Sequence, residues 1–136
     1  MLTQPDGREF PEWFPRNCPS EETPLAEGIV FRFVAKNPVH PDDFRSHREL
    51  GLALQSQPCR GCSLSVYRNL DAAREKLREL RRRNPKRAER HIARGELTNH
   101  DGKLNQAGSD PEHYEWSAFQ GVQPHQSFRV IERVES

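Results

Sequence analysis

The chain has 136 residues, of which 33% are hydrophobic and 30% are charged, and it contains 11 prolines. This composition predicts one small domain with a modest core and a large share of loop. A total of 21 Lys and Arg residues nearly balances 20 Asp and Glu residues, so a generally basic nucleic-acid-binding surface is not indicated. No run of about twenty apolar residues is present, which excludes a membrane-spanning helix.

The first residues carry neither the basic segment nor the apolar segment of a signal peptide. With only three cysteines, the chain is expected to work in the reducing cytoplasm. Export by a specialised secretion apparatus needs no such signal and stays open.

Residues 1–27 form a proline-rich N-terminal arm, because five prolines without backbone donors interrupt any regular structure there. Phe10, Trp13 and Phe14 are expected to anchor this arm, since large aromatic side chains are costly to leave in water. Residues 28–136 are expected to form the compact domain.

The first half of the domain alternates strands and helices. The sequence predicts a strand over residues 29–34, a short helix over 41–50, a strand over 63–67, and a helix that begins after Asn69 or Asp71 and ends at Asn84. In the second helix Ala73, Leu77 and Leu80 share one apolar face.

The second half consists of strands with irregular connections. The sequence predicts strands over residues 90–97, 114–119 and 127–134, and a surface loop over the Asn- and Gly-rich residues 98–112. This order predicts an α+β fold, with a mixed or antiparallel sheet flanked by two or three helices.

Cys59 and Cys62 have the spacing of a zinc knuckle or a redox pair. Zinc needs further ligands, and Cys18 is the remaining cysteine, with His40, His47 or a carboxylate to complete the set. Zinc held by Cys18, Cys59 and Cys62, a redox pair, and ordinary half-buried thiols are the three alternatives.

A basic cluster follows the predicted second helix, and it comprises Arg78, Arg81, Arg82, Arg83, Lys86, Arg87 and Arg90. Such a cluster can grip the phosphates of a nucleic acid. Alternatively, these cations form a solvated helix end that the helix dipole favours, diluted by Glu75, Glu79 and Glu89.

Polar side chains interrupt three predicted strands. Arg32 stands in the apolar run VFRFV, where a guanidinium at a cleft can bind a phosphate or a carboxylate. Ser63 and Ser65 lie two residues apart and share a strand face. His113 and Glu115 share a face of a later strand and can act as acid, base or ligand-orienting groups.

This pattern resembles the Arg-Ser-Glu branch of the ADP-ribosyltransferases. That family has an arginine on its first core strand, a Ser-x-Ser on a later strand and a glutamate further on, which match Arg32 in VFRFV, Ser63 and Ser65 in SLS, and Glu115 in HYEW. His113 stands where the family has Gln or Glu.

The resemblance implies that NAD⁺ binds in a cleft, with Arg32 on a phosphate, Ser65 near a ribose and Glu115 polarising the nicotinamide ribose. On this basis we expect Arg32, Ser63, Ser65 and Tyr67 to bind the nucleotide and Glu115 and His113 to be catalytic. The implied function is a small ADP-ribosyltransferase-like or NAD-handling protein of a bacterial toxin-type conflict system.

The alternative is a non-catalytic module that binds a protein or a nucleic acid through Arg78, Arg81, Arg82, Arg83, Lys86 and Arg87. Convergence of Arg32, Ser65, His113 and Glu115 on one cleft would favour the enzyme.

Overall fold

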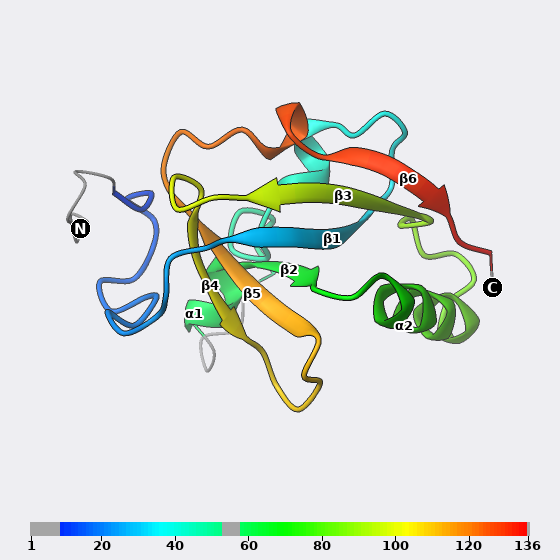
Figure 1. Cartoon of the computed structure of the whole chain (residues 1–136), viewed down its shortest axis with the longest axis horizontal. Coiled ribbons are helices and arrows are strands. Elements are labelled where there is room, and N and C mark those ends of the chain that lie inside the picture. The colour runs from blue at the N-terminus through cyan, green and yellow to red at the C-terminus, as the bar shows by residue number, and fades with distance from the viewer. Residues whose placement is uncertain (1–8, 53–57, 136) are drawn as a thin grey trace.

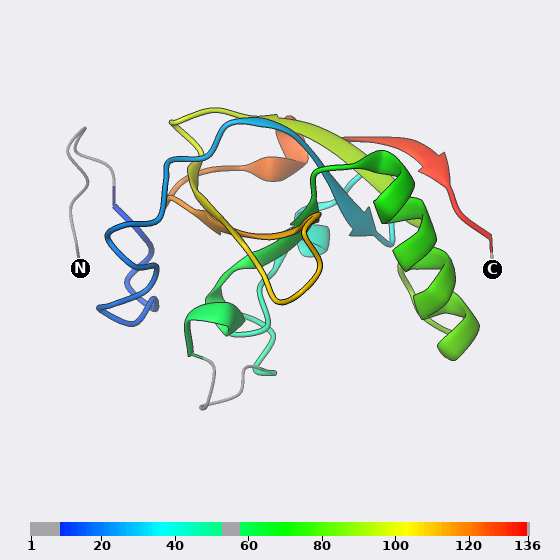
Figure 2. The same cartoon turned by 60° about the horizontal axis from the view of Figure 1, so that its bottom comes forward.

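The structure, a computed structural model, describes residues 9–52 and 58–135. Within these residues six antiparallel strands form one sheet in the order β4-β5-β2-β1-β3-β6 (Figure 1). The strands are β1 (Gly28–Val34), β2 (Leu64–Tyr67), β3 (His91–Leu97), β4 (Gly102–Gln106), β5 (His113–Ala118) and β6 (Arg129–Arg133). The α-helices are α1 (Pro58–Cys62) and α2 (Leu70–Arg83), which lie apart in both views (Figures 1 and 2). The predicted α+β class is confirmed, in its antiparallel form.

Both faces of the sheet carry a hydrophobic core because side chains alternate along each strand. On one face Val30 and Val34 of β1 pack with Trp116 of β5 and with Phe128. On the other face Phe31 packs with Leu77 of α2 and with further apolar residues of β2, β3 and the chain end. The apolar run of the first strand therefore reflects burial on both sides.

The sheet is nearly divided between β1 and β2. β1 pairs with β3 along its whole length, from Gly28 to Val34, but its registered pairing with β2 is limited to Phe31 opposite Tyr67. We call the gap beyond this pair the seam. Arg32 bridges it, because Nη1 donates to the Ser65 carbonyl (2.8 Å) and Nε donates to the Asp43 carbonyl (2.9 Å).

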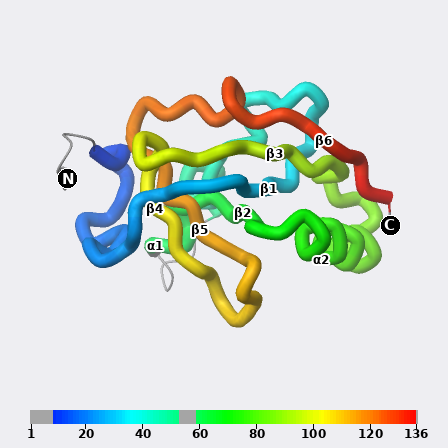
Figure 3. Tube along the Cα trace, viewed as in Figure 1, coloured from blue at the N-terminus to red at the C-terminus, as the bar shows by residue number. Residues whose placement is uncertain are grey.

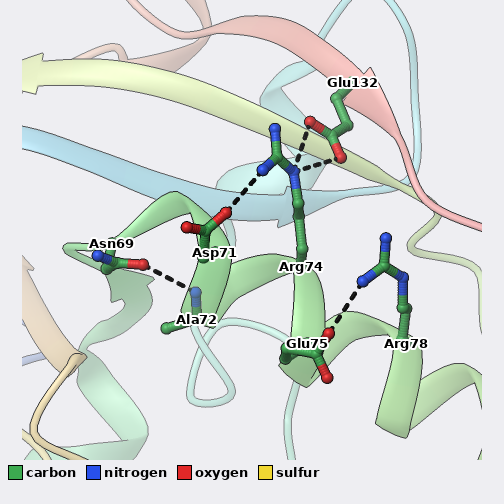
Figure 4. Close-up of polar contacts among 7 residues, drawn as sticks. All are labelled: Asn69, Asp71, Ala72, Arg74, Glu75, Arg78 and Glu132. Carbon is green, nitrogen blue, oxygen red and sulfur yellow. Dashed lines mark hydrogen bonds and ion pairs between the residues drawn. The ribbon is translucent and has the colours of Figure 1, made fainter.

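Helix α2 begins at a capped end and is tied to the sheet by ion pairs. The Asn69 side chain accepts a hydrogen bond from the Ala72 backbone N–H (2.9 Å), as expected for an N-cap (Figure 4). Arg74 reaches Glu132 of β6 (2.8 Å) and Asp71 of its own helix (2.8 Å) (Figure 4). The Arg74–Glu132 pair therefore joins α2 to β6.

The N-terminal arm packs closely on the domain, at the end away from β6 (Figure 3). Phe10 is 4% exposed, stacks on Phe14 and makes a tilted ring contact with Phe119. Farther along, Leu25 forms a β-bridge with Lys103 of the edge strand β4. The aromatic anchors Phe10, Trp13 and Phe14 are buried or half-buried, which agrees with their expected role.

Cys18 of the arm and Cys59 of α1 form a disulfide, while Cys62 is a buried free thiol. The hypothesis of a Cys59–Cys62 redox pair is therefore wrong, and the expectation of reduced thiols fails for two of the three cysteines. A spacing of 41 residues gave no sign of this pairing, which depends on how the arm folds back.

Three local predictions need correction, and two short elements were not predicted. The helix predicted over 41–50 is a single 3₁₀ turn, η1 (Pro41–Phe44). Its start is capped by the His40 ring, which accepts from the Asp42 N–H, and by the Asp43 carboxylate, which accepts from the His40 N–H. The predicted loop over 98–112 contains β4, and the short helix α1 was not predicted. Ser63 lies outside β2, because its hydroxyl donates to the Arg60 carbonyl (3.0 Å) and closes α1. A second 3₁₀ turn, η2 (Pro124–Gln126), precedes β6.

None of the helices in the described residues combines the length and the apolar character that a membrane span requires.

Gly95 of β3 tests the packing beneath the sheet. A Cβ atom at this position would lie 2.5 Å from the Phe128 ring, which itself packs against Phe44 and Trp116. We expect Gly95→Ala to lower the free energy of unfolding by about 1–3 kcal/mol, measured by urea denaturation. The exposed neighbour Glu96→Ala is the control, and equal stability of the two variants would contradict this packing.

The Cys18–Cys59 disulfide should stabilise the fold by restricting the unfolded chain. For a separation of 41 residues we expect Cys18→Ser with Cys59→Ser to cost about 2–4 kcal/mol, measured by thermal melting without reductant. Thiol titration of the denatured, unreduced protein should detect Cys62 alone. Three free thiols in that titration would show that the disulfide is not formed.

Candidate functional site

A pocket of about 740 Å³ opens at the seam, and we call it the seam pocket. Its walls come from β1, β2, β5, η1, α1 and α2, and from the segments that follow η1 and precede β3. All six residues predicted from the sequence line it: Arg32, Ser63, Ser65, Tyr67, His113 and Glu115. Residues that are up to 83 positions apart, such as Arg32 and Glu115, therefore meet in one cavity.

Three adjacent strands place polar side chains in a row, of which those on β2 and β5 line this pocket. Ser65 of β2 lies opposite Glu115 of β5, which lies opposite Asn105 of β4. The Asn105 amide nitrogen is 3.5 Å from one Glu115 oxygen, and Arg60 Nε of α1 is 3.4 Å from the other. The Glu115 side chain is 17% exposed, whereas that of Arg60 is 52% exposed. The carboxylate is therefore recessed and held from both sides.

His113 contacts two other residues of the site, Tyr67 and Ser65. Its ring stacks on Tyr67, with centroids 4.9 Å apart and planes inclined by 14°, because the two residues are paired across β2 and β5. His113 Nε2 lies 2.5 Å from Ser65 Oγ. Burial lowers the pKa of His113, and the charge of Arg60 lowers it further. The neutral imidazole that results can accept the Ser65 hydroxyl proton in this hydrogen bond.

Tyr67 is a buried phenol at the same end of β2. Burial, the largest cause, raises its pKa to about 12, with Asp110 adding to the effect. The hydroxyl group therefore stays protonated over the physiological pH range and acts as a neutral hydrogen-bonding group.

Arg32 is one of the cations that line the seam pocket, together with Lys36, Arg45, Arg60 and Arg87. Burial lowers the pKa of its guanidinium to about 10, so the group remains charged at neutral pH. Within the described residues it has no ion-pair partner, and its hydrogen bonds go to two backbone carbonyls. A guanidinium has five N–H donors, so donors remain for an anion in the pocket.

The structure does not bring the basic cluster together as one free surface. Arg81 is buried, at 4% exposure. Arg78 pairs with Glu75 (Figure 4), and two further pairs join Arg83 to Glu79 and Arg87 to Glu89. Such pairs neutralise much of the positive field that phosphate binding requires.

Two residues of the site were missed by sequence reasoning. Arg60 lies in α1, whose sequence PCRGC carries no helical periodicity. Asn105 lies in β4, within the segment that its Asn and Gly content predicted to be a loop. Leu104 is the one large apolar side chain of GKLNQ, so no alternation of polar and apolar residues identifies β4 in the sequence.

No family model matches the chain, and comparison with curated proteins and with solved structures found no match. In the described part of the chain no cluster of three or more His, Cys, Asp or Glu residues is arranged to hold a metal ion. A zinc ion on Cys18, Cys59 and Cys62 would first require reduction of the disulfide, since zinc binds thiolates. The geometry of the seam pocket is therefore the basis for a functional assignment.

The effect of the Arg60 charge on the pKa of His113 can be measured. The ordinary histidine pKa is 6.5, and the folded value is lower, so the unfolded chain binds more protons between the two values. This contribution to the free energy of unfolding therefore falls as the pH decreases through that window. We expect NMR titration to show a depressed His113 pKa that rises in Arg60→Gln, with His113→Gln used to assign the signal.

Arg83→Gln on the exposed side of α2 is the matched control, because Arg83 pairs with Glu79 and is not among the charges that act on His113. An unchanged His113 pKa in Arg60→Gln would show that the Arg60 charge does not act on the imidazole.

Proposed function

We propose that the chain is a small ADP-ribosyltransferase-like protein that binds NAD⁺ in the seam pocket. One observation carries this proposal: Arg32 of β1, Ser65 of β2 and Glu115 of β5 line a single pocket on three neighbouring strands. The resemblance noted in the sequence requires an arginine, a serine and a glutamate on successive strands to meet in this way. The volume of the pocket is within the range of small-molecule sites.

Glu115 is proposed as the catalytic carboxylate. It would accept a hydrogen bond from a hydroxyl group of the nicotinamide ribose and face the positive charge that develops on the sugar as the glycosidic bond breaks. The bonding electron pair leaves with nicotinamide, and a nucleophile or water then forms the new bond to the sugar carbon and loses its proton. Arg60 and Asn105 act as positioning residues for the carboxylate.

Arg32, Ser65 and His113 are proposed to bind the remainder of the nucleotide. The spare N–H donors of Arg32 suit a phosphate oxygen, and the neutral Ser65–His113 pair suits sugar hydroxyl groups. His113, although named as a catalytic candidate, is proposed here to orient Ser65, because its lowered pKa favours the uncharged ring.

The place of action is proposed from the cysteines. The Cys18–Cys59 disulfide favours a protein that folds or acts in an oxidising compartment, since disulfides are rare in the reducing cytoplasm. This supports the exported form of a toxin-type protein.

NAD⁺ turnover by the purified protein tests the proposal. We expect the purified protein to hydrolyse NAD⁺ to nicotinamide, with the product measured by chromatography. The rate should fall by a factor on the order of 10²–10³ in Glu115→Gln, since the carboxylate acts on charge that develops in the transition state. Glu96→Gln on an exposed part of β3 is the matched control. No turnover by the wild-type protein, or turnover unchanged in Glu115→Gln and Glu115→Ala, would refute the proposal.

A further inference from the structure

A second pocket of about 530 Å³ lies between the N-terminal arm and the domain, and we call it the arm pocket. Phe44, Cys62 and Phe119 line it and are at most 7% exposed, so they form its floor. Trp13 and Phe14 of the arm are half-buried and form one wall. The lining of the arm pocket therefore includes four aromatic side chains, those of Trp13, Phe14, Phe44 and Phe119.

The charged side chains that line the arm pocket are both acidic. Glu12 and Glu49 are exposed and line it, and the described residues that line it include no lysine, arginine or histidine. Glu12 has no hydrogen-bonding or ion-pair partner within the described residues, and Glu49 accepts one bond, from the Ser46 backbone N–H (3.0 Å). Burial raises the pKa of the Cys62 thiol at the floor, and the charge of Arg48 opposes this effect. Carboxylate oxygens thus remain at the rim without partners.

The walls of this pocket are held in place without a ligand. Gln120 N–H donates to the Glu9 carbonyl (2.8 Å), and Phe10 is buried against Phe119 next to it. The Cys18–Cys59 disulfide fixes the far side of the arm to α1. A preformed aromatic cavity requires little reorganisation on binding.

We propose that the arm pocket binds a small amphipathic cation, an arylalkyl ammonium ion. The aromatic floor buries the ring of such a ligand, while the ammonium group lies at the rim near Glu12 and Glu49. Aromatic side chains also attract cations to their faces. An aromatic carboxylate of the same size would be repelled by both glutamates. This site goes beyond the proposed function and does not depend on it.

The test uses 2-phenylethylammonium, with 2-phenylethanol and 3-phenylpropanoate as neutral and anionic probes of similar shape. Trp13 and Trp116 are the two tryptophans of the chain, so two indole N–H signals report binding in ¹H–¹⁵N NMR spectra. Trp13→Phe assigns them. We expect the ammonium ion to shift the Trp13 signal and to leave that of Trp116, which is buried and donates to the Asp101 carbonyl.

The affinity of the arm pocket for the three probes should depend on the charge of each probe. We expect the ammonium ion to bind about tenfold more tightly than the alcohol, and the carboxylate to bind more weakly than either. Glu12→Gln with Glu49→Gln should reduce the affinity for the ammonium ion to that for the alcohol. Glu22→Gln, an exposed acid elsewhere on the arm, is the matched control.

Equal affinities for the ammonium ion and the alcohol, or an affinity unchanged in the double variant, would overturn the proposal. A shift of Trp116 alone would place binding elsewhere and would overturn it too. Glu115→Gln should leave this binding unchanged, so failure here and failure of NAD⁺ turnover are separate results.

Discussion

The weak pairing between β1 and β2 is the constraint on which the rest of the structure depends. β1 is paired with β3 over seven residues, but its registered contact with β2 is Phe31 opposite Tyr67. Backbone groups that a continuous ladder would satisfy need other partners near the seam, and Arg32 supplies one for the Ser65 carbonyl. The same split that interrupts the sheet therefore opens the seam pocket and places a guanidinium in its wall.

In contrast to β1 and β2, the strands β2 and β5 pair without interruption, and this pairing fixes the register of their side chains. Ser65 and Tyr67 face the seam pocket together with Glu115 and His113 of the partner strand, while the intervening Val66 turns into the core. Because strand side chains alternate, a polar site and a hydrophobic core can share the same few residues. A one-residue shift of either strand would exchange the two faces.

The sequence was a good guide where one physical signal dominated. Consecutive β-branched and aromatic residues predicted β1, and Asn69 with the apolar residues that follow predicted α2. It failed where structure depends on distant partners. β4 is an edge strand whose polar residues resemble a loop, and its bridge to Leu25 of the arm could not be seen locally. The Arg60 contact with Glu115 has the same origin, because it needs α1 to be folded over β5.

One thin wall separates two pockets of different chemistry. Leu64 lines both, and along α1 Arg60 faces the seam pocket while Cys62 faces the arm pocket. The arm is attached covalently to this wall at Cys59, the residue directly before Arg60. The position of the group that pairs with Glu115 therefore depends on how the arm is held. The arm, which the sequence predicts to be anchored by its aromatic side chains, is in the folded protein also a structural support of the candidate site.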